Sequence, residues 1–491
     1  MADRGYLTVP VLVLLLAAGF VCGYSLTRTG LVWLVLLAVA LAFLWLRARL
    51  GSQASNASSL NVCVLVLGDI GRSPRMQYHS VSFGKHGYSV TLVGFLGTKP
   101  HNAVLDNEKI KIVPISEVQG LTVGPAIFRY VAKVILQSLQ LFYVLQKIDL
   151  PSYVLMQNPP GLPSIAVTWA VCVVRGSKFV IDWHNYGYTI MGLTHGEKHP
   201  IVQIAKWYEK FFGRFSNHNL CVTNAMKEDL QKNWSIKATT LYDNPPSIFK
   251  EAVLDDQHRL YMKLAKDYSP FRREPVGDPA EERTAFTELD PSTRTAKHVT
   301  HRPALLLSST SWTEDEDFSI LLKALEDYEQ FINNGATLPS LVCVITGRGP
   351  LKEYYKTQIN KMHFKHVQIC TPWLEAEDYP VLLGSADLGV CLHKSSSGLD
   401  LPMKVVDMFG CCLPVCAIHF KCLHELVKHE VNGLIFKDSQ ELAEQLKTLL
   451  ADFPSTHGKL STFRRNLRES RQLRWDESWD QTVLPLLTAD T

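Results

Sequence analysis

The sequence predicts an α/β protein built from two doubly wound parallel-sheet domains. Short apolar segments alternate with longer amphipathic segments in both halves of the chain. Glycine-rich or polar stretches follow many of the apolar segments, and the 491 residues are 46% hydrophobic and 20% charged, enough for more than one core. In such sheets ligands bind at the carboxyl ends of the strands, so the polar stretches found there are the candidate sites.

The net charge and the cysteine pattern argue against two classes of protein, nucleic-acid-binding proteins and disulfide-rich proteins. The formal net charge is only +3, which gives no general electrostatic reason to expect a nucleic-acid partner. The eleven cysteines are scattered without paired CxxC spacing, in a chain too long to need a disulfide framework. We expect reduced thiols and a body that faces the cytosol.

Residues 1–50 contain two nearly uncharged apolar runs, 8–23 and 31–46. Each run is slightly shorter than the roughly 20 residues that cross a bilayer. A cleaved signal peptide, a two-helix hairpin and a single anchor with an interfacial neighbour are the three interpretations. Arg47 and Arg49 directly follow the second run. Because positively charged residues next to a membrane span remain in the cytosol, they favour a transmembrane anchor with the rest of the chain in the cytosol. The number of spans stays open.

The first domain, predicted over 60–250, is expected to bind an anion after its first strand. That strand, 62–67, leads into a glycine turn that carries Arg72, Ser73, Arg75 and His79. Such a turn lets the backbone approach a phosphate, and arginine can bind it with two hydrogen bonds. The alternative is an ordinary strand-to-helix turn with two solvated arginines.

Three residues at strand ends of this domain are candidate general bases. Asp182 and His184 directly follow an apolar strand near 179–181, and Asp69 follows 62–67. The sequence does not rank them. The predicted helix 121–147 is more apolar than a surface helix needs to be, which is typical either of core packing or of a helix lying on a membrane.

Residues 265–302 are rich in Pro, Glu, Arg, Asp and Thr and lack apolar periodicity, which predicts a flexible insertion. A second α/β domain is expected over 303–455, followed by a helical segment over 456–491.

The second domain carries polar residues after several predicted strands. Candidate ligand contacts come from the following residues: Ser309, Ser311, Gly347, Arg348, Gly349 and Trp373. Asp315 and Asp317 match the DxD pattern of a metal site. However, Thr313 and Glu316 have the spacing of a capping box, and acidic residues are common in the first turn of a helix. We therefore predict no metal ligands and no firm cofactor, while a divalent cation, Mg or Mn, remains compatible with the chemistry.

The segment 395–415 predicts the strongest site, in the order loop, helix and strand. Ser397 and Gly398 form the loop, and Lys404 and Asp407 lie three residues apart on the helix that follows. A helix N-terminus and a lysine suit a diphosphate, and a carboxylate can accept hydrogen bonds from two ribose hydroxyls. The competing interpretation is an exposed ion pair worth about 0.3 to 0.5 kcal/mol.

These motifs resemble the donor half of two-domain GT-B glycosyltransferases. The resemblance rests on 347–350, 385–387, 402–407 and 413–415. It implies two domains that face each other across a cleft, with a nucleotide-diphosphate sugar bound by the second one. Asp407 stands where that superfamily usually has Glu, and Leu399 stands in place of its first acid.

Five segments, 68–79, 157–163, 182–187, 308–318 and 395–415, resemble a narrower family, the β-mannosyltransferases that act on dolichyl-diphosphate chitobiose. The resemblance implies GDP-mannose as donor, inversion to a β-1,4 linkage, and a place on the cytosolic face of the endoplasmic reticulum membrane beside other mannosyltransferases of the same pathway. Arg72, Ser73, Arg75 and His79 would then bind the acceptor diphosphate. A GT-B enzyme with another donor or lipid acceptor, and a non-catalytic membrane scaffold of the same fold, are the alternatives.

Overall fold

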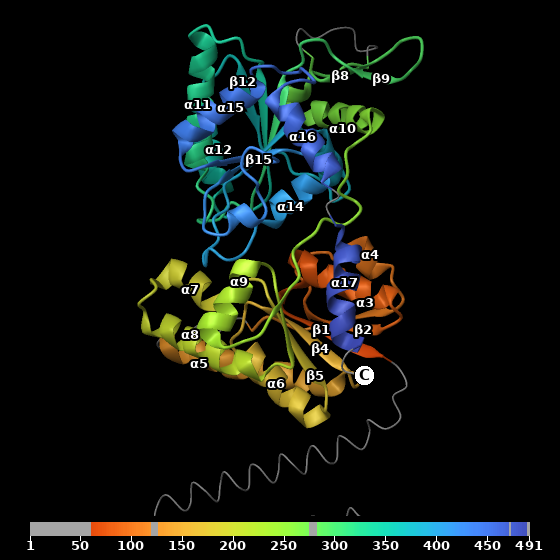
Figure 1. Ribbon diagram of the computed structural model, residues 1–491, viewed down its shortest axis with the longest axis vertical. Helices are drawn as coiled ribbons and strands as arrows, with labels where there is room; N and C mark the ends of the chain where they lie inside the picture. Colours follow the sequence, from red (N-terminus) through yellow and green to blue (C-terminus); the bar gives the residue numbers. More distant parts are fainter. Residues whose placement is uncertain (1–59, 119–125, 274–281, 471–472, 489–491) are drawn as a thin grey trace, which may run out of the picture. The chain divides into compact units, whose positions relative to one another are not determined.

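The computed structural model of the protein describes residues 60–118, 126–273, 282–470 and 473–488. The chain divides into two compact units (Figure 1). Unit 1 comprises residues 1–183 and 200–219, and unit 2 comprises residues 184–199 and 220–491. Residues 184–199 therefore group with the second half of the chain, although the sequence places them in the first predicted domain.

The first sheet has seven strands in the order β3-β2-β1-β4-β5-β6-β7. The strands are β1 (Asn61–Asp69), β2 (Ser89–Phe95), β3 (Ile110–Pro114), β4 (Tyr153–Asn158), β5 (Lys178–Trp183), β6 (His218–Cys221) and β7 (Thr239–Thr240). β1 pairs in parallel with β2 and β4, and Val62 to Val66 are buried, as expected of a strand covered on both faces. The predicted parallel sheet is confirmed.

The helices of unit 1 cover the two faces of this sheet. α3 (Pro74–Lys85) and α4 (Asn102–Leu105) follow β1 and β2, while α5 (Ala126–Lys147), α6 (Ser164–Arg175) and α8 (Pro200–Phe212) follow β3, β4 and β5. The chain moves from β1 to β3 in one direction along the sheet and from β3 to β6 in the other. Because crossover connections are right-handed, α3 and α4 lie on one face and α5, α6 and α8 on the opposite face.

The second sheet lies in unit 2 and is parallel throughout, in the order β12-β11-β10-β13-β14-β15. Its strands are β10 (Ala304–Ser309), β11 (Leu341–Thr346), β12 (Val367–Cys370), β13 (Leu388–Cys391), β14 (Val415–Ile418) and β15 (Gly433–Phe436). The helices between them are α11 (Phe318–Asn333), α12 (Lys352–Ile359), α13 (Asp378–Ser385) and α14 (Met403–Gly410), and α15 (Ser439–Leu450) and α16 (Lys459–Glu469) follow the last strand. A second doubly wound unit is therefore confirmed.

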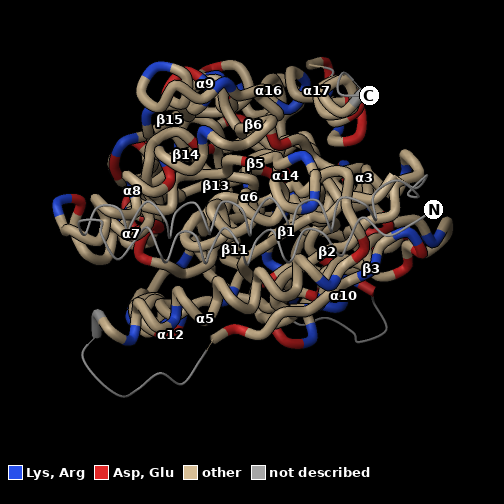
Figure 2. Tube along the Cα trace, turned by 90° about the horizontal axis from the view of Figure 1, so that it is seen from below, with Lys and Arg blue, Asp and Glu red and all other residues tan. Residues whose placement is uncertain are grey.

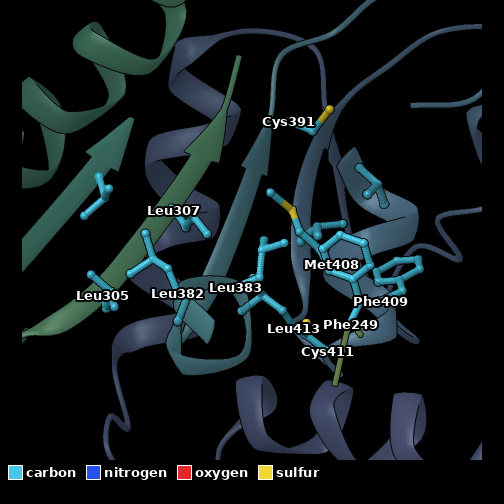
Figure 3. Close-up of a cluster of buried hydrophobic side chains, with 14 of the residues drawn as sticks. Phe249, Leu305, Leu307, Leu382, Leu383, Cys391, Met408, Phe409, Cys411 and Leu413 are labelled. Atoms are coloured by element: carbon cyan, nitrogen blue, oxygen red, sulfur yellow. The ribbon is translucent and has the colours of Figure 1, made fainter. Parts of the chain in front are cut away.

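One apolar cluster of unit 2 holds α14 against the sheet (Figure 3). Met408 and Phe409 of α14 belong to this cluster, and Leu382 and Leu383 of α13 lie between them and the β10 leucines. The approach is close, because a Cβ atom on Gly389 of β13 would lie 2.6 Å from the Met408 sulfur. Packing of this kind fixes where the first turn of α14 lies, and with it the lysine at position 404.

The segment predicted as a flexible insertion contains ordered structure on both sides of residues 274–281. β8 (Thr287–Leu289) and β9 (Ala296–His298) form an antiparallel pair. Phe271 and Phe286 are buried and pack on Tyr261 of α10 (Leu254–Asp267), with ring centroids 5.6 and 4.9 Å from that ring. The polar composition of the segment gave no indication that these two aromatic residues are buried. The prediction of a flexible insertion is therefore wrong for the described residues on either side of 274–281.

The predicted membrane anchor, residues 1–50, lies outside the described residues. Within the part of the chain that the structure describes, no helix is both long enough and apolar enough to cross a bilayer. The final helix, α17, spans Trp475–Thr488, within the helical segment expected over 456–491.

An ion pair joins the segments that lead into β10 and β13, the two middle strands of the second sheet. Arg302 donates to both oxygens of Asp387, at 2.7 and 2.8 Å, and Asp387 also accepts from the Leu305 amide at 2.8 Å. Burial would raise the pKa of Asp387, but Arg302 and these hydrogen bonds lower it overall. Both side chains are only 12% exposed, so removal of one partner leaves the other poorly solvated.

We therefore expect Asp387→Ala to destabilise unit 2 by about 3 kcal/mol, because it strands the Arg302 guanidinium. Hydrogen exchange of peptides from β10 and β13 in increasing urea measures the loss locally. Glu326→Ala breaks an exposed pair with Lys323 and is the matched control, with an expected loss below about 1 kcal/mol. Equal protection of both strands in the two variants would contradict the assignment.

Candidate functional site

The candidate site of unit 2 is organised by a buried carboxylate, Glu316, which lies in the loop between β10 and α11. One of its oxygens forms an ion pair with the ammonium group of Lys404, in the first turn of α14. The other accepts from the Thr310 hydroxyl and from the Ser311 amide, the latter at 2.9 Å. The pair ties the start of α14 to the end of β10 and holds the lysine at the carboxyl edge of the sheet.

Two glycines let the loop after β11 lie directly against the end of β10. A Cβ atom on Gly347 would lie 1.8 Å from the Thr310 carbonyl oxygen, and Gly347 has φ +146°, a value that side chains disfavour. A Cβ atom on Gly349 would lie 1.7 Å from the Ser311 carbonyl oxygen. No other residue type fits either position, so the two predicted loops meet.

Arg348 and Trp373 come from neighbouring strand ends and contact each other. The guanidinium carbon lies 3.5 Å from the centroid of the indole ring, a close cation–π contact. Trp373 is 47% exposed. The sequence predicts each of them as a donor contact, and the structure brings the two together, with one face of the indole covered by the arginine.

Asp407 lies one turn after Lys404 and is partly buried. Burial, and then the neighbouring Asp243 carboxylate, raise its pKa well above the usual value. Hydrogen bonds donated by hydroxyl groups would counter that rise by stabilising the carboxylate. The hydroxyl of Tyr379, on α13, donates to Ser309 at 3.0 Å, and Asp407 helps to raise the pKa of this tyrosine, after burial as the larger cause.

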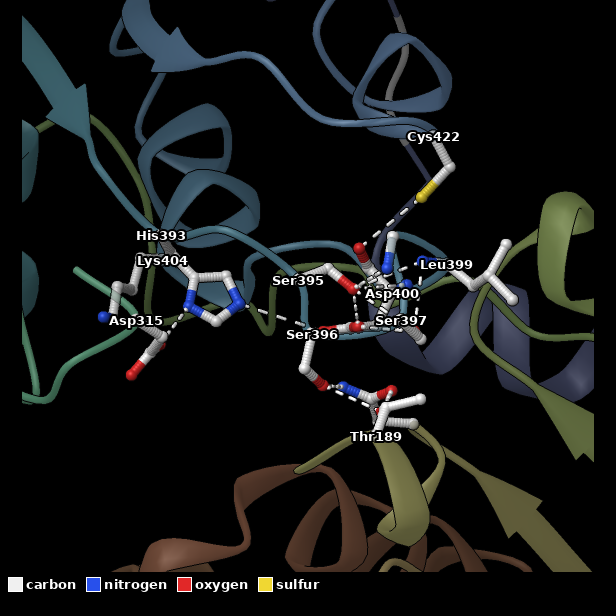
Figure 4. A network of polar contacts seen from close by, with 12 residues as sticks. Thr189, Asp315, His393, Ser395, Ser396, Ser397, Leu399, Asp400, Lys404 and Cys422 are labelled. Carbon is white, nitrogen blue, oxygen red and sulfur yellow. Dashed lines mark hydrogen bonds and ion pairs between the residues drawn. The ribbon is translucent and has the colours of Figure 1, made fainter. Parts of the chain in front are cut away.

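The loop at 395–400 is closed by its own side chains (Figure 4). The Ser395 hydroxyl accepts from the amides of Gly398, at 2.8 Å, and Leu399, at 3.2 Å, and donates to the Asp400 carboxylate. Ser397 also donates to Asp400, at 3.4 Å. The predicted contacts Ser397 and Gly398 therefore belong to a preformed turn, with Ser395 at its centre.

His393 follows β13 and lies between two carboxylates (Figure 4). Its Nδ1 atom is 2.9 Å from Asp315, and its Nε2 atom is 3.8 Å from Asp400. Burial lowers the pKa of His393, but the hydrogen bond to Asp315 and the nearby Asp400 carboxylate outweigh it and raise the pKa to about 9. The imidazolium is therefore the expected form at neutral pH, and it adds a second positive charge near Lys404.

Unit 1 presents an organised turn at the end of β1. The Asp69 carboxylate accepts from the amides of Gly71, Gly97 and Thr98 at 3.1 to 3.2 Å. Burial would raise its pKa, but these hydrogen bonds, led by Thr98, lower it overall. Arg72 is 77% exposed, with Nε 3.7 Å from Asp69. Asp69 therefore holds the loops beside an accessible arginine.

Three of the residues predicted in unit 1 bind one another in its interior. Arg75 donates to both oxygens of Asp182, at 2.8 and 3.0 Å, and the His79 Nε2 atom lies 3.1 Å from the same carboxylate. All three side chains are at most 2% exposed. The structure thus corrects two predictions. Arg75 and His79 do not present themselves to an acceptor diphosphate, and Asp182 is a buried ion-pair partner rather than an accessible base.

Ser73 and His184 have different outcomes. The Ser73 hydroxyl donates to the Asp69 carbonyl at 3.1 Å, so it too helps to build the turn. His184 is half-buried and is the first residue of the segment 184–199, which groups with unit 2. Its role as a base stays a prediction.

Known proteins resemble this chain over nearly its full length. The chitobiosyldiphosphodolichol beta-mannosyltransferase of Homo sapiens is 64% identical over 444 residues, which cover 90% of this chain and 95% of that protein. The protein of the same name from Mus musculus is 60% identical over 460 residues, 93% and 94% of the two chains. This chain belongs to the chitobiosyldiphosphodolichol beta-mannosyltransferase family.

Two further comparisons also identify the chain as a glycosyltransferase. The family model "Glycosyl transferases group 1" matches residues 292–468. An Arabidopsis thaliana protein named "UDP-glycosyltransferase TURAN" is 42% identical over 453 residues, 87% of this chain and 97% of that protein.

Solved structures give the fold. The sucrose-phosphate synthase of Thermosynechococcus elongatus has a TM-score of 0.60 at 11% identity and covers 88% of this chain and 100% of its own. Anabaena HepE, in complex with UDP and glucose, has a TM-score of 0.58 at 14% identity and covers 88% and 99%. The mannosyltransferase chain thus has a GT-B-like fold, as predicted.

Sequence reasoning missed Glu316, Tyr379, Ser395 and His393 in this β-mannosyltransferase, for identifiable reasons. We assigned Glu316 to a capping box, but α11 begins later, with Asp317 as its N-cap, which accepts from the Ser319 amide at 3.0 Å. That prediction is wrong, and the shift of the helix start leaves Glu316 free to turn toward Lys404. The position of His393, directly after an apolar strand, was the available signal.

The raised pKa of His393 gives the stability of the enzyme a pH dependence. The folded value of about 9 exceeds the ordinary value of about 6.5, so the imidazolium stabilises the fold fully below about pH 6.5, and this contribution is lost as the pH rises through about 9. Relative to His393→Gln, the wild-type protein should lose about 3 kcal/mol of unfolding free energy over that window.

Urea unfolding at several pH values measures the unfolding free energy, and an NMR titration of the imidazole measures the pKa of His393. His363→Gln, which removes an exposed imidazole, is the control. A difference between wild type and His393→Gln that does not change with pH would exclude the double carboxylate contact.

Proposed function

We propose that the protein transfers one mannose from GDP-mannose to dolichyl-diphosphate chitobiose, with inversion to a β-1,4 linkage, the first mannosylation of this lipid-linked oligosaccharide. The printed names of its relatives support the acceptor and the sugar. The observation that carries the proposal is the anchored lysine of unit 2, where Glu316 holds Lys404 at the N-terminus of α14, and the same Thr310–Ser311 segment lies against the loop that carries Gly347 and Gly349. A diphosphate is the ligand that such a group of donors suits.

Inversion needs a single in-line attack by the acceptor hydroxyl, with one general base and one stabilised leaving group. Lys404, Arg348 and the amides of the first turn of α14 would stabilise the charge that develops on the GDP leaving group. Each charge-assisted hydrogen bond is worth about 1.5 to 3 kcal/mol, so two or three of them give substantial stabilisation. Asp69 and His184 remain the candidates for the base, because Asp182 is committed to Arg75.

We further propose that residues 1–50 anchor the enzyme in the endoplasmic reticulum membrane, with both units in the cytosol, where it works beside other mannosyltransferases of its pathway. The two apolar runs and the arginines that follow them support this orientation.

A second donor class needs a direct test, because one relative bears the name UDP-glycosyltransferase. The purified full chain would be given a short-chain lipid-diphosphate chitobiose with GDP-mannose, or with UDP-glucose or UDP-N-acetylglucosamine in parallel reactions. We expect one added hexose from GDP-mannose alone, and its release by a β-mannosidase but not by an α-mannosidase. Transfer from a UDP-sugar would overturn the donor, and no transfer from any donor would favour the scaffold interpretation.

Lys404→Ala tests the leaving-group contact. We expect kcat/KM to fall about 10- to 100-fold, which corresponds to the loss of one charge-assisted hydrogen bond. Lys437→Ala removes an exposed lysine of the same unit and should retain full activity. Full activity in Lys404→Ala would refute the proposed donor site.

Arg72→Ala tests the acceptor side. The exposed guanidinium at the end of β1 should bind the lipid diphosphate, so the KM for the acceptor should rise about tenfold while the KM for GDP-mannose stays unchanged. Lys109→Ala, an exposed cation of the same unit, is the control. An equal change in both KM values would mean that Arg72 does not distinguish the two substrates.

A further inference from the structure

The segment 184–195, which contains α7 (Gly187–His195), is hydrogen-bonded to the loop at 395–400. The side-chain amide of Asn185 donates to the Ser396 hydroxyl at 3.1 Å, and the Thr189 hydroxyl lies 3.0 Å from the same oxygen (Figure 4). Both sides of this contact belong to unit 2. The loop that precedes the anchored lysine is therefore bound by a segment about two hundred positions earlier in the chain.

The backbone around Asn185 is held in place, because the next residue is part of the interior. Tyr186 is only 1% exposed, and its hydroxyl donates to Asp229 at 2.7 Å. Its ring stacks on that of Trp234, with centroids 4.5 Å apart and 14° between the planes. The side-chain oxygen of Asn185 accepts from the Tyr186 amide at 2.7 Å. Both ends of the Asn185 side chain are thus engaged, one with its own backbone and the other with Ser396.

His184 is the residue directly before Asn185 and directly after β5. It is half-buried, and it belongs to unit 2 together with Ser396 and Lys404. Adjacent Cα atoms are about 3.8 Å apart. The hydrogen bond from Asn185 to Ser396 therefore also determines how far His184 lies from the loop before α14.

The composition of the segment makes His184 its candidate for proton transfer. Residues 184–195 contain no Asp, Glu, Lys or Arg, and α7 accordingly shows only the tan of other residues in Figure 2. Histidine is the side chain that most often serves as a general base. The other histidine of the segment, His195, is exposed at the far end of α7, whereas His184 adjoins the contact with Ser396.

The carboxylates that could compete for this role are bound to hydrogen-bond donors. Glu316 forms an ion pair with Lys404, and Asp315 forms one with His393. A cation stabilises the ionised form of a carboxylate and makes it a weaker base. In unit 1, burial would raise the pKa of Asp69, but its hydrogen bonds lower the pKa overall. These contacts favour His184 over the three carboxylates.

We propose that His184 is the general base of the sugar transfer and that Ser396 positions it through Asn185, an inference that rests on the proposed function. The acceptor hydroxyl attacks the anomeric carbon of mannose, and its proton passes to the imidazole. The bond from that carbon to the β-phosphate oxygen breaks, and its electron pair leaves with GDP. The imidazolium then releases the proton to water, which restores the base.

His184→Ala in the full chain tests the base, with GDP-mannose and a short-chain lipid-diphosphate chitobiose as substrates. We expect kcat to fall about 100- to 10,000-fold, while the Kd for GDP-mannose, measured by titration calorimetry, stays within about twofold. Added imidazole should raise the residual kcat at least about tenfold, because it supplies the missing base. His195→Ala, at an exposed position of the same segment, should keep full activity and should not respond to imidazole.

His184→Gln separates proton transfer from a structural role. Glutamine keeps a hydrogen-bonding side chain of similar size but cannot take the proton, so kcat should fall to the same extent as in His184→Ala. Wild-type kcat in either variant would overturn the base, and so would a loss of activity in His184→Ala that imidazole does not restore.

Ser396→Ala tests the positioning role. It removes the partner of Asn185 and Thr189 and leaves His184 in the chain, so kcat should fall about 10- to 100-fold without a response to imidazole. The Kd for GDP-mannose should stay unchanged, and Ser340→Ala, at an exposed serine of unit 2, is the control. Wild-type kcat in Ser396→Ala would overturn the positioning role alone. Absence of sugar transfer by the wild-type protein would instead refute the proposed function, so the two failures are distinguishable.

Discussion

The candidate site of unit 2 depends on a buried carboxylate that is fully hydrogen-bonded. Glu316 bonds Lys404 through one oxygen and the end of β10 through the other. A carboxylate removed from water is costly unless its partners replace the lost hydration. Its three partners come from a helix start and a strand end that are distant in sequence, so burial of Glu316 requires both to be in place. The ion pair therefore constrains the geometry of the site more than it adds stability.

The same constraint explains why the loops around Lys404 are preformed. The glycines at 347 and 349 allow the β11 loop to lie on the backbone of Thr310 and Ser311, the residues that also bind Glu316. On the other side, Ser395 and Asp400 close the loop before α14, and His393 forms ion pairs with Asp315 and Asp400. Backbone amides and two cations are thus held near one strand edge before any ligand binds, which lowers the ordering cost of binding.

Unit 1 uses an equivalent carboxylate for a different purpose. Asp182 is saturated by Arg75 and His79 in the interior, while Asp69 organises the turn that leaves Arg72 exposed. Arg72 and Arg75 are only three residues apart, yet the first is exposed and the second is buried. Their difference lies in burial, since Arg75 sits on the core side of α3 and Arg72 precedes that helix.

Local sequence patterns were enough to predict the fold and the chemistry of the strand ends, because apolar periodicity and glycine placement depend directly on backbone conformation. The two parallel sheets, the loops at 347–350 and 395–400, and the positions of Lys404 and Asp407 follow from such local patterns. Which charged side chains pair with each other depends instead on the three-dimensional fold. Glu316 and Lys404 are 88 positions apart, and Arg75 and Asp182 are 107 apart, and each pair forms because strand order brings distant strand ends together.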